Sequence, residues 1–581
     1  MGFLARNATG QGSPHESRTL KDVATSSRSQ NHRHLSEHPN PLANAPSDKV
    51  SADYLPMTSR FSQIVKEHRA LIVVLLAAFA VRMLWFQTPV VRDEGCLGYF
   101  AMAWSNGYPP YSEPMAANAA PLAISTYHML GHFWAHTIEP IRVFNNLLFV
   151  LSVAALYSLV KNWYGKRTAL VSAVFYSVFM NAPVFETHLA IQSSLSLPFV
   201  VFAVYFFGEY LASSSTMKLF LSGVMMSFAF LMMQYHVVGI AFLFAMMAFS
   251  AYSRSRQENL SRSHTVSRFG VGVAVLLLSV LLPIAVFGTY YWSQGALGGW
   301  VEHTMLTYVT GSPYFHQGDV STSLKILIAV EGLPLWIFAF IGFVSLILRV
   351  GAKQSSGDNA LFCTVWLLVS LIAAVPAPHH GRHFSQIVAP ASVLAAIALD
   401  PVLDTIKFKC TNGPSGHHHR SIVSVFLIGT LLVSLVLSGF LQANQYPNSS
   451  FSLWGQSWEY TFSRTRQEQR ALVNYLRGQN GPILVHGWEA ELYWLSGHLA
   501  PSVHWATSYG GPGSDISTEG YQEILDDVKD GYFDTVVLMY GFEPDQIMSY
   551  VDQESSYSYV SRIGNYDIYS YAASHDAHLE V

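Results

Sequence analysis

An acidic pair, Asp93-Glu94, stands directly after the first long apolar run of the chain, with Arg92 immediately before it. If that run spans a membrane, the pair marks the point where the chain leaves the bilayer, and carboxylates there are costly and often functional. Such a carboxylate can accept a proton from a substrate, or it can face water as an ordinary loop residue. The elements that hold the pair decide between these two roles.

The composition is that of a membrane protein. Of 581 residues, 51% are apolar and only 12% are charged, whereas soluble domains carry about 25% charged residues. The net charge of −4 gives no signal for nucleic acid. The cysteines Cys96, Cys363 and Cys410 are far apart, so neither a disulfide framework nor a metal site is implied.

The apolar runs define three regions of the chain. Residues 1–69 are rich in Ser, Asn, His and Pro and are predicted to form a disordered tail. Residues 70–441 contain runs long enough to span a bilayer as helices. The predicted spans are at about 70–88, 141–160, 168–184, 193–212, 217–233, 236–252, 269–292, 324–349, 360–376, 384–400 and 421–441. This gives about eleven transmembrane helices and a long loop over 89–140, in which Asp93 lies.

The distribution of Lys and Arg predicts the orientation, because short cytoplasmic loops carry excess positive charge. Basic residues gather in alternate loops, for example Lys161, Lys166 and Arg167. This pattern puts the N-terminus in the cytoplasm and Asp93 and the C-terminal region on the external face of the cell membrane. The same balance indicates that Pro121 to Ala135 does not span the membrane but lies as an amphipathic helix at the outer interface.

Three histidines, His128, His132 and His136, recur at i, i+4 spacing along that interfacial segment. Residues four apart lie on one face of a helix, so the stripe is either a metal or phosphate site or a polar interfacial face. Beyond the last span, residues 442–581 change character and predict a small external α/β domain. Strands are expected at 482–486 and 535–540, and two further tyrosine-rich segments alternate like edge strands.

An ordered set of motifs resembles the first external loop of the GT-C membrane glycosyltransferases, which include protein O-mannosyltransferases and the aminoarabinose transferase acting on lipid A. The set comprises the acidic pair, Trp104, Gly107, Pro110, Tyr111, Glu113 and the Pro121-Leu122 helix start. Further similarity lies in the turn Trp163 to Arg167, the Gly-containing helix 223–233 and the segment Arg382 to Pro390. One difference is Ala119-Ala120-Pro121, where family members often have Lys-Pro-Pro.

The resemblance implies an inverting transfer of a sugar from a polyprenyl-monophosphate donor to a glycan, lipid or protein acceptor at the external face. The acceptor hydroxyl must lose a proton, and Asp93 is the candidate base, with Glu94 as a neighbour that orients it, binds sugar or faces water. Arg382 is the first candidate for the donor phosphate, because a guanidinium matches phosphate oxygens. Arg92 and His383 are further candidates for that role.

The remaining candidate substrate contacts are Tyr111 and Glu113 in the first loop and Glu186 and His188 in the turn after the third span. No cofactor is required by the pattern. A divalent metal could be held by Asp93, Glu94, Glu113 and external histidines once the chain is folded, although no spacing demands it. Two other functions share the many-helix layout: a multi-span transporter, and a glycan polymerase or ligase that uses a lipid diphosphate. Charge in the external loops rather than in the spans speaks against the transporter.

Overall fold

The computed structural model describes most of the chain in thirteen segments. They are 57–112, 119–133, 136–182, 185–257, 262–306, 333–351, 357–374, 381–411, 466–486, 489–500, 518–539, 546–553 and 556–572. The chain divides into two compact units, Met1–Lys66 and Glu67–Val581. The second unit contains the first loop, the apolar helices that follow it and the C-terminal sheet. Residues 1–56 of the predicted tail lie outside the described residues, and their disorder stays a prediction, whereas residues 57–69 form the start of the first helix.

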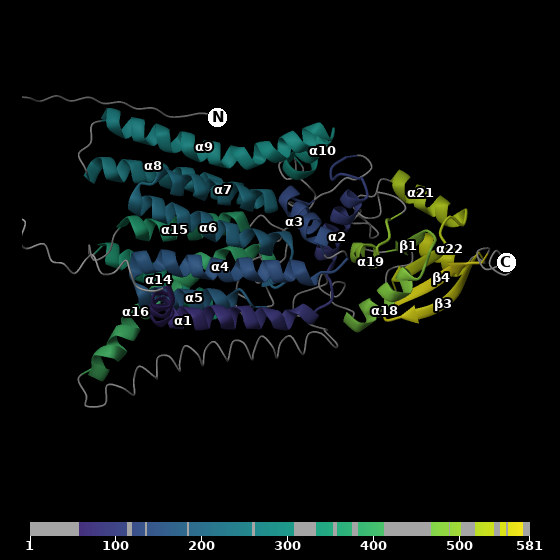
Figure 1. Ribbon diagram of the computed structural model, residues 1–581, viewed down its shortest axis with the longest axis horizontal. Coiled ribbons are helices and arrows are strands. Elements are labelled where there is room, and N and C mark those ends of the chain that lie inside the picture. The colour runs from purple at the N-terminus through teal and green to yellow at the C-terminus, as the bar shows by residue number, and fades with distance from the viewer. Residues whose placement is uncertain are drawn as a thin grey trace, which may run out of the picture. The chain divides into compact units, whose positions relative to one another are not determined.

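A helix occurs at each predicted span from 70–88 to 384–400 (Figure 1). These helices are α1 (Met57–Leu84), α4 (Glu139–Tyr164), α5 (Lys166–Phe179), α6 (Gln192–Ser213), α7 (Thr216–Met232), α8 (Val237–Gln257), α9 (Arg262–Ser293), α14 (Leu333–Gly351), α15 (Gly357–Ala374) and α16 (Ser385–Thr411). The stretch 217–252 forms two helices, because the short turn η5 (Gln234–His236) separates α7 from α8. The predicted span 421–441 lies outside the described residues.

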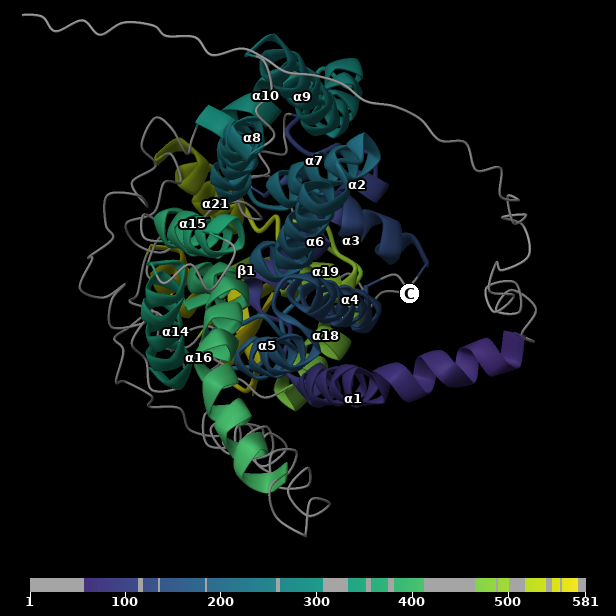
Figure 2. The same cartoon turned by 90° about the vertical axis from the view of Figure 1, so that its left-hand side faces the viewer.

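Several of these helices are long and apolar enough to cross a membrane. Within the described residues there are five such segments: Glu139–Tyr164, Gln192–Ser213, Gln234–Ser255, Ser263–Ser293 and Arg382–Asp400. Three shorter apolar helices accompany them. Most of these helices are seen end-on in Figure 2, and α16 lies beside α14 and α5. A multi-pass membrane protein is therefore the class of this fold, and the total of eleven spans stays a prediction.

The first loop folds into two helices that pack against each other. After the short turn η3 (Trp85–Gln87), α2 runs from Arg92 to Ser105 and carries Asp93 and Glu94 in its first turn. The helix α3 (Pro121–Phe133) forms where the sequence predicts the interfacial helix. Two small elements, α10 (Leu297–Val301) and η6 (Glu302–Leu306), follow α9.

The C-terminal segment forms a four-stranded sheet with the strand order β1-β2-β4-β3. The strands are β1 (Ile483–His486), β2 (Thr535–Met539), β3 (Tyr557–Ile563) and β4 (Tyr566–Tyr571), and the accompanying helices are α18 (Arg466–Arg477), α19 (Ala490–Ser496), α21 (Thr518–Lys529) and α22 (Gln546–Gln553). β1 pairs parallel with β2, and β4 pairs antiparallel with both β2 and β3. The expectation of an edge position is right for β3 and wrong for β4, because alternation shows only that one face is buried and not which neighbours a strand has.

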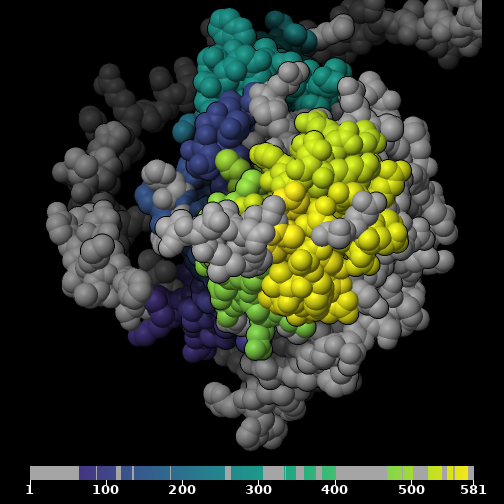
Figure 3. All heavy atoms as spheres, turned by 90° about the vertical axis from the view of Figure 1, so that its right-hand side faces the viewer, coloured from purple at the N-terminus to yellow at the C-terminus, as the bar shows by residue number. Residues whose placement is uncertain are grey.

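The two faces of this sheet enter different cores, because successive strand residues point to opposite sides. Leu484, Val536 and Leu538 pack in a core with residues of α21 and α22. The alternate residues, such as Val485 and Val537, belong to a second core that also contains α18, α19, α2 and α3. Figure 3 shows the strands and α21 from the outside. The first loop and the C-terminal sheet thus share one hydrophobic core.

Candidate functional site

Asp93, Arg382 and Glu186 come together from three distant parts of the chain. Arg382 lies in η7 (Gly381–Phe384), just before α16, and its guanidinium is ion-paired with the Asp93 carboxylate. The same Nη1 atom lies 3.5 Å from Oε2 of Glu186, in the connection between α5 and α6. Asp93 keeps 34% of its side chain exposed and Arg382 22%, whereas Glu186 keeps 8%. The site is therefore open to a substrate at Asp93 and closed around Glu186.

Glu186 has an unusual environment for a carboxylic acid. Burial raises its pKa to about 7, nearby Asp93 acts in the same direction, and the hydrogen bond and charge of Arg382 oppose the shift. Its backbone is left-handed, with φ of 51°, which is uncommon for a residue other than glycine. At neutral pH the Glu186 carboxyl group is therefore close to half-ionised. The negative charge next to the Arg382 guanidinium then depends on the pH.

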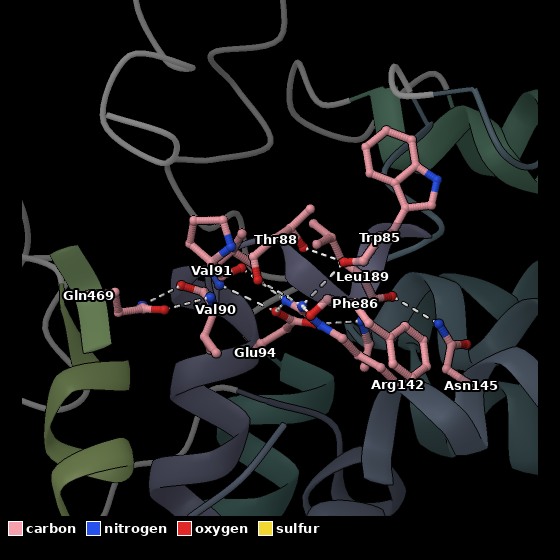
Figure 4. A network of polar contacts seen from close by, with 12 residues as sticks. Trp85, Phe86, Thr88, Val90, Val91, Glu94, Arg142, Asn145, Leu189 and Gln469 are labelled. Carbon is pink, nitrogen blue, oxygen red and sulfur yellow. Dashed lines mark hydrogen bonds and ion pairs between the residues drawn. The ribbon is translucent and has the colours of Figure 1, made fainter. Parts of the chain in front are cut away.

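Glu94 lies in a closed polar network (Figure 4). Arg142, near the start of α4, donates from Nε to Oε1 of Glu94 over 2.9 Å and from Nη2 to Oε2 over 2.5 Å. The backbone N–H of Ala190 also donates to Oε1, at 2.8 Å. Both side chains of the pair are buried, with Glu94 at 0% and Arg142 at 1% exposure. In this arrangement Glu94 has no face open to a substrate.

Arg142 also satisfies the carbonyl groups of the segment that precedes α2. Its Nη1 donates to Thr88 O and its Nη2 to Pro89 O, both over 2.9 Å. The segment 88–91 is neither helix nor strand, and buried carbonyls there would otherwise lack partners. Removing one partner of such a buried ion pair typically costs about 3–5 kcal/mol, because an uncompensated charge stays behind. The Glu94–Arg142 pair therefore fixes the entry into α2.

A glutamine from the C-terminal segment also binds the backbone just before α2. Gln469 of α18 accepts a hydrogen bond from Val90 N at 2.9 Å and donates one to Val90 O at 3.0 Å. The Val91 N–H donates to Oε2 of Glu94 at 3.3 Å. Sequence reasoning missed Gln469, and its only signal is a polar residue on an otherwise apolar stripe of α18.

The other phosphate candidates lie close in sequence to the two charged members of the site. His383 is buried next to Arg382, and its ring stands edge-on to Tyr235 at 5.2 Å between centroids. Arg92 lies in the first turn of α2 and hydrogen-bonds the Cys96 thiol, whose pKa burial raises to about 11. Arg92 and Asp93 are thus at the N-terminal end of α2, where the helix dipole favours an anion.

Two of the predicted substrate contacts are found in the interior. The Tyr111 hydroxyl donates to the carbonyl of Ala119, and its ring meets Tyr291 edge-on at 4.9 Å. His188 stacks on Trp85 with ring centroids 4.0 Å apart, and burial holds its pKa well below the usual value. Within the described residues neither ring nitrogen of His188 has a hydrogen-bond partner. Glu113 lies outside the described residues.

Of the three histidines, His128 lies in α3 and His136 follows that helix, and these two contact different partners. His128 stacks on Trp104 at 4.3 Å and contacts the Ser105 hydroxyl. His136 lies beside Gly497, which follows α19. The side chain of His132 lies outside the described residues. Among the residues that the structure describes, no group of three or more His, Cys, Asp or Glu side chains could hold a metal ion.

The chain is similar to known glycosyltransferases in part of its sequence and in its fold. A family model described as dolichyl-phosphate-mannose-protein mannosyltransferase matches residues 120–290. No curated protein matches the sequence. ArnT from Cupriavidus metallidurans bound to undecaprenyl phosphate is 13% identical with a TM-score of 0.59, and the alignment covers 87% of this chain and 99% of that one. The apo state of that protein gives a TM-score of 0.57 at 13% identity, covering 89% and 99%.

A second solved structure has the same fold. The archaeal oligosaccharyltransferase AglB from Archaeoglobus fulgidus, in complex with an inhibitory peptide and a dolichol-phosphate, is 13% identical with a TM-score of 0.52. The alignment covers 87% of this chain and 75% of that one. At this identity the likeness concerns the fold. The family model covers less than half of the chain, and the solved structures share its fold at 13% identity, so the similarity to membrane glycosyltransferases lies in the fold and in part of the sequence.

Proposed function

We propose that the protein transfers a sugar from a polyprenyl-monophosphate carrier to a hydroxyl acceptor at the external face of the cell membrane. The acceptor oxygen forms a bond to the anomeric carbon, the bond from that carbon to the phosphate oxygen breaks, and the acceptor proton passes to Asp93. A single displacement of this kind inverts the anomeric configuration. The acceptor class is a cell-envelope glycan, lipid or protein.

The observation that carries the proposal is the contact between Asp93 and Arg382, whose positions are 289 residues apart. A general base has to reach the acceptor, and Asp93 is a partly exposed carboxylate on a fixed helix turn. A lipid phosphate that departs needs a fixed cation, and Arg382 offers a fork of donors that matches phosphate oxygens. The proposed base, Asp93, and the proposed phosphate-binding cation, Arg382, are therefore in direct contact.

The ion pair also suggests an order of events. In the free protein Arg382 faces two carboxylates, so it is held in place without a substrate. A donor phosphate brings negative charge of its own and competes with Asp93 for the guanidinium. Asp93 that is released from Arg382 becomes a better proton acceptor, because it loses its stabilising positive neighbour. Donor binding thus prepares the base.

Glu94 takes a positioning role in this proposal, because its contacts are with Arg142 and the backbone around α2. Arg92 and His383 remain further candidates for the donor phosphate, and Glu186 and His188 for the sugar. The lipid carriers named in the two solved relatives, undecaprenyl phosphate and dolichol-phosphate, support a polyprenyl phosphate as the donor class.

Sugar transfer in isolated membranes tests the proposal. Membranes with the wild-type chain receive radiolabelled polyprenyl-phosphate sugars, and label in the lipid and acceptor fractions is followed. Asp93→Asn keeps the shape and removes the base, and transfer is expected to fall about 10²–10⁴-fold. The matched control is Asp530→Asn, at an exposed position after α21, which is expected to leave transfer unchanged.

Three results would contradict the proposal. The first is full transfer by Asp93→Asn at normal protein levels, which would remove Asp93 from the reaction. The second is movement of an intact lipid-linked or free sugar across the membrane with no glycosidic bond formed, which is the behaviour of a transporter. Consumption of lipid-diphosphate sugars alone would instead identify the polymerase or ligase class.

A further inference from the structure

Gln469 holds the backbone immediately before the catalytic turn, although it belongs to the C-terminal segment. Its amide joins Val90 from a position 379 residues further along the chain. Val90 is 3% exposed and Gln469 also 3%. The contact is therefore inside the protein, where each bond is shielded from competing water.

The geometry of this contact selects for a primary amide. One side-chain oxygen accepts from Val90 N, and one side-chain nitrogen donates to Val90 O, so a single planar group satisfies both polar atoms of one residue. Gln does both without a charge at any pH, whereas Glu does so only when its carboxyl group is protonated. Glu would accept the N–H but would place negative charge against the carbonyl oxygen.

The position of Gln469 on α18 indicates that the contact is more than incidental. Leu472, Val473 and Leu476 are buried, and together with Gln469 they form the i, i+3, i+4, i+7 stripe of a helix that faces a core. Gln is depleted at buried positions because its amide must find partners there. The backbone of Val90 supplies both partners.

The segment 88–91 is thereby held from two sides. Arg142 of α4 binds the carbonyls of Thr88 and Pro89, and Gln469 binds Val90. Asp93 lies three residues after Val90, in the first turn of α2. A displacement of about 1 Å in a reacting group can reduce a rate by roughly 100-fold. A shift of segment 88–91 that moved Asp93 by this distance would therefore lower the transfer rate.

We propose that Gln469 is a positioning residue for the transfer reaction: through its two hydrogen bonds to Val90, the C-terminal segment fixes the turn that carries Asp93. The inference rests on the proposed function, in which Asp93 is the base. The C-terminal segment then contributes to the rate by fixing the position of the first loop.

The test compares Gln469→Glu with Gln467→Glu in the full-length protein. Gln467 lies on the same helix and is exposed, so it controls for the added charge. At neutral pH we expect Gln469→Glu to lower kcat about 10- to 100-fold with the KM for a polyprenyl-phosphate sugar nearly unchanged. Gln467→Glu should behave as wild type. Equal kcat values for the two variants would overturn the inference.

The pH profile separates positioning from general damage to the fold. In the Gln469→Glu variant, a protonated carboxyl group again donates and accepts, and burial next to a carbonyl favours that neutral form. The ratio of Gln469→Glu to wild-type kcat should therefore rise as the pH falls. A ratio that stays flat over the pH range in which both proteins remain folded would overturn the inference.

A second measurement does not depend on sugar transfer. Cys96 lies on α2, and with Cys363 and Cys410 replaced by Ala its alkylation by N-ethylmaleimide reports opening of that helix. Labelling should be faster in Gln469→Glu than in Gln467→Glu. Equal labelling rates would count against a role of the Gln469–Val90 hydrogen bonds in holding α2. If wild type transfers no sugar, the proposed function fails; if wild type transfers and only the Gln469 comparison is flat, the positioning role alone fails.

Discussion

At the scale of single residues, Asp93 and Glu94 show how adjacent carboxylates acquire different roles. Successive helix residues point about 100° apart, so the two side chains diverge from the first turn of α2. Asp93 reaches a partly exposed Arg382, and Glu94 is enclosed with Arg142. The same kind of charged group is thus partly exposed beside Arg382 at one position and enclosed with Arg142 at the next. Sequence adjacency alone does not separate these roles.

Glu186 gives a prediction for the pH dependence of stability. Its pKa is about 7 in the folded protein and 4.5 in an unfolded chain, so the folded state binds more protons between these values. The free energy of unfolding contributed by this group is therefore greatest below pH 4.5 and is lost as the pH rises through 7. Replacement by Gln removes the titration and should stabilise the protein at about pH 8 by roughly 1–3 kcal/mol.

Thermal unfolding of purified Glu186→Gln at about pH 5 and about pH 8, on either side of the folded pKa, measures this effect. The gain in Tm over wild type should be larger at the higher pH. Glu523→Gln, an exposed carboxyl of α21, is the matched control and should show no such difference. A gain of equal size at both pH values would mean that Glu186 does not titrate in this range.

Part of this site is predictable from the residues. Asp93 stands out because it follows an apolar run, and Arg382 because its segment resembles a family motif, and the structure places the two in contact. The enclosure of Glu94 by Arg142 is not predictable, because it depends on how α4 packs against the first loop. Tyr111 is expected at the substrate, but its hydroxyl is bonded to the Ala119 carbonyl. Its role in binding remains a prediction.

At the scale of elements, glycines set the distance between α2 and α19. A Cβ atom built on Gly95 would lie 2.5 Å from the Cα atom of Glu491, and one built on Gly98 would overlap the Trp494 ring. Both positions are far inside van der Waals contact. The two helices can approach this closely only because α2 carries no side chain at these positions. Local helix propensity alone would favour alanine at both positions.

The element boundaries are more predictable than the contacts between elements. Apolar runs and the polar break at Gln234 locate α7 and α8 because hydropathy is a local property of the chain. The strand order β1-β2-β4-β3 depends on pairing between distant segments, and alternation in β4 does not reveal its inner position. The close approach at Gly95 is likewise a property of two helices far apart in sequence.

Gly95→Ala tests the role of this approach. The added methyl group meets the backbone of α19, which cannot move aside as a side chain can, so we expect destabilisation of about 1–3 kcal/mol. Gly131→Ala on α3 is the matched control, because no described residue beyond the adjacent part of its own helix has an atom within 4 Å of the added Cβ. The control should be neutral or stabilising by up to about 1 kcal/mol. Thermal unfolding of the two variants, side by side, gives the comparison, and equal Tm values would show that α2 and α19 do not approach this closely.

At the scale of the whole molecule, one core joins the first loop to the C-terminal segment. Leu97 and Phe100 of α2, Tyr127 of α3, Leu472 of α18 and Val537 of β2 all belong to it. The membrane helices pack mainly in a second core, in which Phe149 and Val204 are buried, and their ends also enter the first core, for example with Leu195 of α6 and Tyr291 of α9. The C-terminal segment therefore covers apolar surface of the first loop in addition to holding Val90.

Deletion of residues 442–581 tests this arrangement. The remaining chain would expose the apolar face of α2 and leave the Val90 backbone without Gln469, and exposed patches of this kind cause association. We expect aggregation in detergent and loss of sugar transfer, measured by size-exclusion chromatography and by the membrane assay. Deletion of residues 1–50, in the predicted tail, is the control and should preserve both. A monodisperse chain of residues 1–441 that still transfers sugar would show that the first loop holds the turn with Asp93 without the C-terminal segment. That result would also contradict the positioning role of Gln469.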